Sequence, residues 1–326
     1  MAITPVNIAD TTGIRGVPAN MALAKEVFSG LVLEAFARKN LALNLVTSKT
    51  IQSGSSTYFP VIAQLSDAAI GDYVVGADVE TSAIPVKERV ITIDAPQYVS
   101  LSISRLEEKI LEFDTRSELA NQMAEALSTK VDKDVFSTIL LASQTSGTID
   151  GIAMQPDGSE VNNDAIHDGA TAEEKGDALF AATFEANTLF KEKDVIGEPV
   201  VVTTPANFNN LVQSAKGINR DYTSGNGGVD TGTIVQVAGI KYMWSNHLPT
   251  STYVDVGETN TRYLQALAFT PECVGVVKLM DIMTEIDHIP TRIQEDLLKT
   301  WYWLGMGVLK PACACAITGG DTGVAA

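Results

Sequence analysis

The chain has 326 residues, of which 45% are hydrophobic, so it is long enough for about two domains with sizeable cores and does not have the composition of a disordered protein. Acidic residues outnumber basic residues by 40 to 23, which gives a formal net charge of −17. This excess of negative charge argues against a surface that grips nucleic acid by neutralising phosphates.

The cysteines Cys273, Cys313 and Cys315 indicate reduced thiols in an intracellular protein, because their number is odd and their spacing fits no disulfide framework. If Cys313 and Cys315 lie on one strand, both side chains point to the same face, and we expect them to be buried and to bind no metal. The first ten residues lack the pattern of a signal peptide, and no apolar run approaches the ~20 residues of a membrane span. We therefore expect a protein that is made and assembled in a cytoplasm, with no membrane partner.

Two segments open the chain. Residues 1–20 are polar and rich in turn-forming Pro and Gly, which predicts an extended arm. The segment Met21–Lys39 predicts a helix with an apolar stripe. The pattern leaves open whether this stripe packs on its own domain or on a neighbour. The stripe consists of Val27, Phe28, Leu31, Val32, Ala35 and Phe36.

Strands are predicted from Thr57 to about Arg105. The runs TYFPVIAQL and IPVKERVITID predict a two-stranded ribbon whose strands are joined by the Gly/Asp-rich stretch Ser66–Ser82. Such a ribbon is marginal in water by itself, so it must lean on its own sheet or on another molecule. The charged run KER at 87–89 is typical of the rim of an interface. The next run, QYVSLSIS, alternates apolar residues with serine and predicts a half-buried strand.

The longest predicted element is a helix from Asp114 to about Ser143, about which the rest of the chain is organised. Thr115 and Glu118 form a capping-box pattern at its start, and no Pro or Gly interrupts the next ~28 residues. Its apolar residues recur at every fourth position, so the stripe winds around the axis. We infer that the helix crosses several partners in turn; the alternative is an ordinary core helix. The stripe consists of Leu119, Met123, Leu127, Val131, Val135 and Ile139.

The middle of the chain predicts an α/β sandwich-like domain. A loop-rich insert at Gly147–Gly169 includes a solvated turn at 157–160 that lacks the spacing of a calcium loop. Thr171 caps a helix that runs to about Lys193, EPVVVTT predicts a buried strand, and Thr204 caps another helix. The glycine-rich segment Gly217–Gly232 has no dinucleotide fingerprint, and we expect it to be a mobile contact loop.

Further strands are predicted at Ile234–Trp244 and Tyr263–Phe269 and in the runs VGVVKLMDIMTEID and QEDLLKTWYWLGMGVLKPACACAIT, followed by a flexible tail, GGDTGVAA. The three histidines lie in unrelated segments, and the sequence contains no GxSxG, HExxH or Walker pattern. We therefore expect that the protein is not an enzyme and that it needs no cofactor or metal.

Several short runs occur in a specific order between residues 25 and 315, although no single run is decisive. They are Val27-Phe28-Ser29-Gly30 with Leu33–Arg38, Phe59-Pro60-Val61, Glu88–Asp94, Asp114–Glu118, Val237–Ile240, His247-Leu248-Pro249, Val274–Leu279, Gly305-Met306-Gly307 and Lys310-Pro311. In these runs, and in the order of its elements, the chain resembles the major capsid proteins of short-tailed, T-seven-like podoviruses (autographiviruses).

The resemblance implies an α+β fold of the Hong Kong ninety-seven (Johnson) type, in which successive segments have separate roles. In order, they are an N-terminal arm and helix (1–56), an extended E-loop hairpin (57–98), a P-domain segment (99–145) with the long spine helix (114–143), an A-domain (146–271), returning P-domain strands (272–316) and a flexible tail (317–326). The short N-terminus and the compact region at 146–170 depart from the family pattern.

The resemblance also implies contact sites in place of catalytic ones. The E-loop and an A-domain loop near the capsomer axis are expected to contact neighbouring subunits, and the N-terminal helix is expected to contact a scaffolding protein. The E-loop residues are Gly71, Asp72, Tyr73, Lys87, Glu88 and Arg89; the A-domain loop residues are Arg220, Asp221 and Tyr222; the scaffold contacts are Val27 and Phe28.

The implied function is that of a major capsid protein of a tailed bacteriophage. Its copies would assemble through hexamers and pentamers into an icosahedral shell that encloses double-stranded DNA without sequence-specific binding, with a scaffolding protein and a portal as partners and the virion as final location. One alternative is an encapsulin-like bacterial compartment shell of the same fold, which would need a groove for a cargo peptide. Another is an α/β enzyme, which would need convergent polar residues in a pocket.

Overall fold

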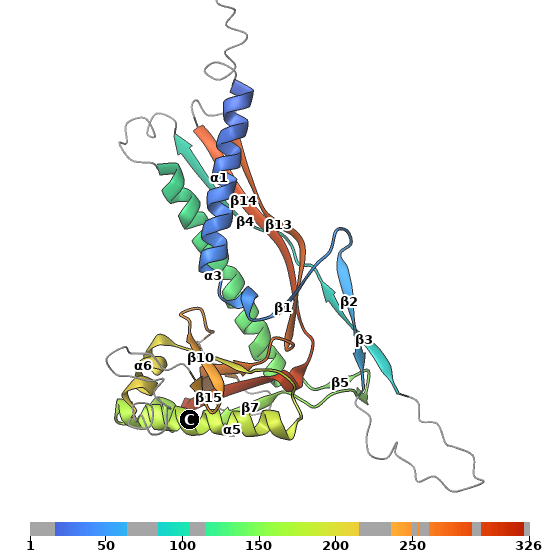
Figure 1. Cartoon of the computed structure of the whole chain (residues 1–326), viewed down its shortest axis with the longest axis vertical. Helices are drawn as coiled ribbons and strands as arrows, with labels where there is room; N and C mark the ends of the chain where they lie inside the picture. Colours follow the sequence, from blue (N-terminus) through green and yellow to red (C-terminus); the bar gives the residue numbers. More distant parts are fainter. Residues whose placement is uncertain are drawn as a thin grey trace, which may run out of the picture.

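In the computed structural model of the chain, two sheets and two long helices form the body, and a two-stranded hairpin projects from it (Figure 1). The structure describes residues 17–63, 84–104, 115–214, 236–249, 253–254, 261–288 and 295–322, with only the backbone of residues 17–26, 115, 253–254, 261, 288 and 321–322. The helices are α1 (Val17–Lys39), α3 (Thr115–Gln144), α4 (Ala165–Asp168), α5 (Ala172–Glu192) and α6 (Pro205–Gln213), with short 3-10 turns η2 (Ala42–Asn44) and η4 (Pro311–Cys313).

The strands are distributed over a four-stranded sheet, a seven-stranded sheet and two hairpins. They are β1 (Thr47–Thr50), β2 (Ser56–Ile62), β3 (Val86–Thr92), β4 (Gln97–Ser104), β5 (Thr148–Ile149), β6 (Ile152–Ala153), β7 (Ser159–Asn162), β8 (Val200–Thr203), β9 (Gln236–Val237), β10 (Ile240–Trp244), β11 (Tyr253–Val254), β12 (Thr261–Phe269), β13 (Val274–His288), β14 (Glu295–Val308) and β15 (Ala314–Thr322).

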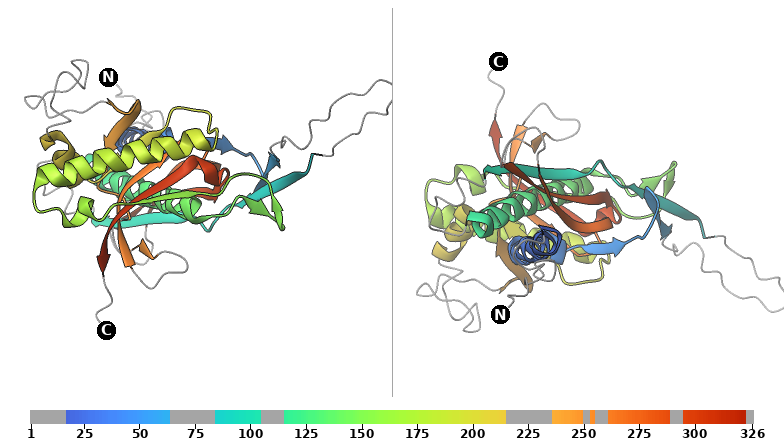
Figure 2. Two further views of the ribbon diagram at one scale, coloured as in Figure 1. Left: turned by 90° about the horizontal axis from the view of Figure 1, so that it is seen from below. Right: turned by 90° about the horizontal axis from the view of Figure 1, so that it is seen from above.

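The four-stranded sheet has the order β1-β13-β14-β4, and α1 and α3 lie side by side over one of its faces (Figures 1 and 2). Strand β4 confirms the predicted alternation, because Ile103 is buried and Val99 and Leu101 are half-buried, whereas Tyr98 and the serines at 100 and 102 are exposed. Helix α1 confirms the predicted N-terminal helix. It begins at Val17, however, so the extended arm predicted for 1–20 is wrong for its last four residues; residues 1–16 lie outside the described part of the chain.

Helix α3 confirms the predicted spine and its passage across several partners. It packs against α1, η2, β4, β13 and β14, and also against β7, β12, β15 and η4. Five of the six predicted stripe residues are buried and Leu119 is partly buried. The buried surface is wider than predicted, because Ala120, Ala124, Asp132 and Phe136 are buried beside the stripe. The side chain of Thr115, and with it the predicted capping box, lies outside the described residues.

The seven-stranded sheet confirms the predicted α/β sandwich. Its order is β7-β15-β12-β8-β10-β9, with β11 paired to β12, and α3 packs on one face while α5 and α6 pack on the other. Helix α5 begins with the predicted capping box of Thr171 and Glu174. Neighbouring residues of β15 alternate between the two cores: Ala314 and Ala316 face α3, and Cys315 and Ile317 face α5. The resulting core is closed on both sides of the sheet.

Four sequence-based predictions are wrong in this half of the molecule. The flexible tail predicted for 317–326 is strand β15 up to Thr322, and this strand pairs with β12 in the seven-stranded sheet. The loop-rich insert contains β7, a sheet strand whose Ser159 is buried, so the solvated turn predicted at 157–160 is wrong there. The single strand predicted at Ile234–Trp244 is the hairpin β9–β10. Cys313 belongs to η4, so it does not share a face with Cys315.

Candidate intersubunit surfaces

The hairpin β2–β3 is seated on glycines of the four-stranded sheet. A Cβ atom added to Gly307 would meet Ile91 Cγ1 at 2.8 Å, and one added to Gly275 would meet Ile91 Cδ1 at 3.0 Å. At Gly305 an added Cβ would lie 2.4 Å from the Thr92 carbonyl oxygen. These glycines therefore let the base of the hairpin approach the sheet closely enough to bury Ile91.

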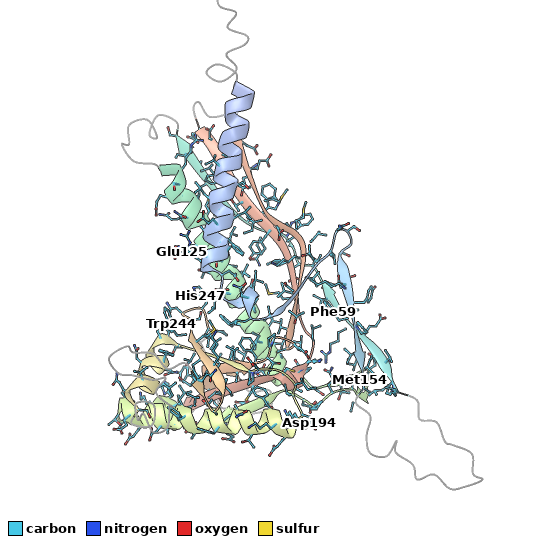
Figure 3. All side chains as sticks on the ribbon, in the orientation of Figure 1. Phe59, Glu125, Met154, Asp194, Trp244 and His247 are labelled. Atoms are coloured by element: carbon cyan, nitrogen blue, oxygen red, sulfur yellow. The ribbon has the colours of Figure 1, made fainter. Side chains whose placement is uncertain are left out.

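Three further contacts hold the inner face of the hairpin, and Figure 3 shows Phe59 and Met154 on this side. The Lys49 ammonium of β1 lies 5.4 Å from the centre of the Phe59 ring. Lys87 Nζ lies 3.0 Å from an Asp150 carboxylate oxygen in the β5–β6 turn, and Met154, after β6, is buried against the hairpin. The inner face of the ribbon thus packs against its own subunit. This is one of the two alternatives that the sequence left open; the other was packing against another molecule.

The opposite face of the hairpin is open to solvent and carries two apolar cross-strand pairs, with Pro60 and Glu88 paired between them. Tyr58 pairs across the strands with Val90, and Ile62 pairs with Val86. The exposed fractions of these four side chains are 58%, 51%, 63% and 59% in that order. A two-stranded ribbon that presents adjacent large apolar residues is typical of a surface that another protein covers. These four residues are called the outward hairpin face below.

The charged run of the hairpin is arranged differently from the predicted interface rim. Only Glu88 lies on the open side. Lys87 pairs with Asp150, and Arg89 is partly buried beside Phe59 in the register, where burial lowers its pKa. Strand alternation turns Lys87 and Arg89 towards their own subunit, so they do not share the open side with Glu88. Contact of these three residues with a neighbouring subunit stays a prediction. The other proposed contact residues, Gly71, Asp72, Tyr73, Arg220, Asp221 and Tyr222, lie outside the described residues.

The two predicted scaffold contacts on α1 differ in accessibility. Phe28 is 3% exposed and belongs to the core between α1 and α3, whereas Val27 is 57% exposed. Leu33, also exposed, lies six residues further along the helix, and a Cβ on Gly30 between them would meet no atom within 4 Å. Of the two predicted contacts only Val27 is accessible, and the exposed residues Gly30 and Leu33 extend the surface beside it; Val27, Gly30 and Leu33 are called the accessible stripe below.

An aromatic groove of about 350 Å³ lies on the face of the four-stranded sheet that carries Tyr98. Tyr98 is 70% exposed and lies opposite Trp301, which in turn lies opposite Met283 on the next strand. The sequence predicted the strands but not this row, because strand registers are set by tertiary pairing. The groove is lined by Pro96, Tyr98, Ser100, Leu297, Lys299, Trp301 and Trp303.

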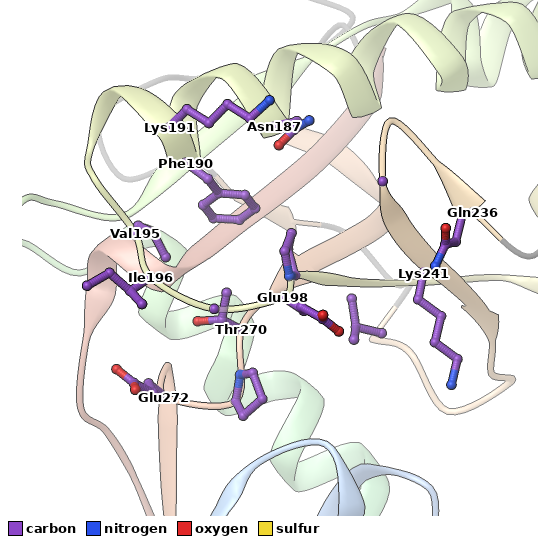
Figure 4. A pocket seen from close by; sticks show the side chains of 15 residues that line it. Asn187, Phe190, Lys191, Val195, Ile196, Glu198, Gln236, Lys241, Thr270 and Glu272 are labelled. Atoms are coloured by element: carbon purple, nitrogen blue, oxygen red, sulfur yellow. The ribbon is translucent and has the colours of Figure 1, made fainter.

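A larger cavity of about 750 Å³ lies at the edge of the seven-stranded sheet, beside the end of α5 and the turn between β9 and β10 (Figure 4). Its floor includes Phe190, and Lys191, Lys241, Glu198 and Glu272 lie around it with mixed charge. No histidine or cysteine lines it, and among the described residues no group of His, Cys, Asp or Glu could hold a metal ion. None of the described helices combines the length and apolarity that a membrane crossing needs.

A buried carboxylate on the spine helix joins the two halves of the subunit. Asp132 accepts hydrogen bonds from the backbone amides of Ala42, at 3.0 Å, and Leu41, at 3.5 Å. The same carboxylate contacts His247 Nδ1 at 3.0 Å, in the turn after β10, where Figure 3 shows His247. No sequence motif marks this cluster, because its members are about 90 and 115 residues away from Asp132 in the chain.

Comparison with known proteins accounts for this combination of a spine helix, a projecting ribbon and open apolar faces. The family model described as "Gp10A-like: Major capsid protein" matches residues 58–318, which is most of the chain. The chain belongs to this family. Its fold is accordingly of the Hong Kong ninety-seven type, its role is structural, and its place is the virion of a tailed bacteriophage.

Individual relatives of this capsid protein support its assignment to the family. It is 24% identical to the major capsid protein of Escherichia phage T7 over 94% of both chains. Among solved structures, it matches the capsid of the cyanophage P-SCSP1u with a TM-score of 0.72, 28% identity and coverage of 87% of this chain and 89% of the other. The mature capsid of bacteriophage PhiM1 shares the fold, with a TM-score of 0.70, 17% identity and coverage of 87% and 88%.

Family membership changes the interpretation of the exposed apolar surfaces. Copies of a capsid protein assemble into a closed shell, so each subunit must have surfaces that only a neighbour covers. The outward hairpin face and the aromatic groove are two described surfaces with the chemistry for this task.

Proposed function

We propose that this capsid protein assembles through hexamers and pentamers into an icosahedral shell, and that the outward hairpin face is the main apolar contact between neighbouring subunits. The observation that supports this proposal is the exposure of Tyr58, Ile62, Val86 and Val90, each more than half accessible in the single subunit. Full burial of an exposed Val or Ile side chain contributes about 1.5–3 kcal/mol, and covering the part of these side chains that is still exposed contributes roughly half of that each. Repeated around every capsomer, such contacts favour a closed assembly.

The aromatic groove is the proposed seat for the outward hairpin face of a neighbour. The hairpin base is fixed to its own subunit, so its exposed face is presented in a defined direction and little ordering is needed on contact. The groove offers Tyr98 and the tryptophans at 301 and 303, and aromatic residues are typical of the buried centre of an interface. Beyond the described residues, Gly71, Asp72, Tyr73, Arg220, Asp221 and Tyr222 remain proposed contacts at the hairpin tip and the capsomer axis.

The remaining partners follow from charge and from the accessible stripe on α1. A net charge of −17 favours a shell that encloses double-stranded DNA without binding it tightly or reading its sequence. Val27, Gly30 and Leu33 are the proposed contact for a scaffolding protein during assembly in the host bacterial cytoplasm, and a portal would complete the shell. The compartment-shell alternative has no better support than the phage capsid among these matches.

The test introduces negative charges into the outward hairpin face. We expect the double variant Ile62→Glu/Val90→Glu to remain folded, because both positions are solvent-exposed, but to form no shells when expressed with its scaffolding partner. Negative-stain electron microscopy measures the shells, and circular dichroism measures folding.

The control is Ala181→Glu/Thr188→Glu, which adds the same charge on the exposed side of α5. This variant should assemble like the unmodified protein. Normal shells from the hairpin variant would overturn the proposed interface, and an unmodified protein that stays monomeric with its scaffolding partner would overturn the proposed assembly.

A further inference from the structure

Strand β4 leaves one long edge of the four-stranded sheet without a partner in the described part of the chain. It pairs with β14 along all eight residues without a register shift, and no described backbone group bonds to its other side. Figures 1 and 2 show it at the margin of the sheet. An unpaired edge presents a row of amide and carbonyl groups that can pair with a further strand.

The other described strands at sheet margins carry features that prevent such pairing. At the opposite margin of the same sheet, β1 has only four residues, including Lys49. Pro60 interrupts β2, and β3 carries the charged run at 87–89. In the seven-stranded sheet, β7 has four residues including Glu160, and β9 and β11 have two residues each. Short length, charge and proline are the usual means of protecting an edge.

Strand β4 has none of these protecting features. Its sequence, QYVSLSIS, contains no charged residue and no proline. An exposed, uncharged edge of this length favours uncontrolled pairing, so its persistence in a protein that assembles in many copies indicates a partner in the assembly.

The sequence of β4 fits a second copy of itself. In an antiparallel pair with Leu101 opposite Leu101 of the second copy, Val99 lies opposite Ile103 and Ser100 lies opposite Ser102. Residues directly opposite each other lie on the same side of a sheet, so apolar residues meet apolar residues and serines meet serines, with no charge conflict. The two-fold axis is perpendicular to the sheet, so α1 and α3 of both copies stay on the same side. A shell with distinct inner and outer surfaces requires such an arrangement.

We propose that β4 pairs antiparallel with β4 of a second copy across a local two-fold axis, forming one continuous eight-stranded sheet from two four-stranded sheets. This contact differs from the hairpin contact because it is made by backbone hydrogen bonds and is isologous. It rests on the proposed shell assembly.

Hydrogen exchange measured by mass spectrometry on the unmodified protein tests the occupation of the edge. In shells, amides in 97–104 that face away from β14 should exchange at least about tenfold more slowly than in the soluble subunit. Shells in which this segment exchanges as fast as in the subunit would overturn the β4 contact alone. Failure to form any shells would overturn both this contact and the proposed assembly.

Charge complementation tests the identity of the partner strand. Ser100→Lys/Ser102→Lys and Ser100→Glu/Ser102→Glu each place like charges opposite each other, so each variant alone should lose most of its shells. An equal mixture should recover them, because lysines then face glutamates. The same pairs of changes at Ser48 and Thr50, on the exposed margin strand β1, are the controls and should assemble normally.

Thermal unfolding of each soluble variant checks that the subunit is intact, since Ser100 lies opposite Lys299 within the same sheet. Because Ser100 also lines the aromatic groove, the uncharged double variant Ser100→Gln/Ser102→Gln is a size-matched control that should keep its shells. If the exchange experiment shows a protected edge and this control assembles, but the mixture does not recover shells, another strand occupies β4 and the proposed self-pairing is wrong.

Discussion

At the scale of single residues, Asp132 is the side chain on which the junction between the two halves of the subunit depends. We expect Asp132→Ala to lower the free energy of unfolding by about 1–3 kcal/mol, because it leaves the buried amide of Ala42 without an acceptor. Urea denaturation of the soluble subunit measures this loss. His247→Ala is the control and should cost less, since His247 is 29% exposed and water can replace its contact. Equal losses in the two variants would contradict this account of the junction.

Buried side chains were predicted correctly from the sequence where apolar residues recur with a clear strand or helix period. The alternation in QYVSLSIS and the apolar stripe of α3 were both confirmed. The sequence did not show that Lys87 and Arg89 point towards their own subunit, because the direction in which a charged strand residue points depends on which face of the ribbon the rest of the subunit covers. Asp132 had no local signal at all, since a single acidic residue in a long helix is normally solvated.

At the scale of elements, the seat of the hairpin depends on close backbone approach at Gly305. We expect Gly305→Ala to lower the free energy of unfolding by about 1–3 kcal/mol, because its Cβ would meet a backbone oxygen that cannot move aside. Gly30→Ala is the matched control: it should raise the free energy of unfolding by about 0.5–1 kcal/mol, since the site is open and alanine favours the helix. Urea midpoints of both variants are the measurement. A Gly305 variant as stable as the unmodified protein would show that the hairpin does not depend on this approach.

Helices were predicted more accurately than the last strands. Caps and uninterrupted helix-forming runs define α3, α5 and α6 locally. Strand β15, in contrast, ends in glycines and looks like a tail in isolation; it is a strand because β12 and β7 supply partners on both sides. Strand β7 was missed for the same reason, as its pairing partner lies more than 150 residues away.

At the scale of the whole molecule, the closed core predicts sensitivity to alkaline pH. Burial raises the pKa of the Cys315 thiol from 9.0 to about 12 and also raises the pKa values of Cys273 and Cys313. Between pH 9 and about pH 12 the Cys315 thiol is ionised in the unfolded chain but protonated in the folded protein. The unfolded chain therefore binds fewer protons, and the free energy of unfolding falls as the pH rises. Below about pH 9, these thiols should give no such slope.

Cys315→Ala removes one of these groups. We expect the variant to reduce the slope of unfolding free energy against pH by up to about 1.4 kcal/mol per pH unit in this window. Denaturant unfolding at a series of pH values measures the slope. An unchanged slope would indicate that the Cys315 thiol is accessible in the folded protein.

The family that the sequence resembles is the family to which the chain belongs. The sequence could not predict which apolar surfaces and strand edges of the subunit remain exposed to solvent after folding. The outward hairpin face, the aromatic groove and the free edge of β4 each arise from registers between strands that are far apart in the chain.

Cryo-electron microscopy of shells assembled from the unmodified protein is the most direct test of the central claim that this subunit completes its apolar surfaces with neighbouring copies. We predict closed shells in which Tyr58, Ile62, Val86 and Val90 of each subunit are covered by the aromatic groove of a neighbour. A shell in which these four side chains face solvent would contradict the account.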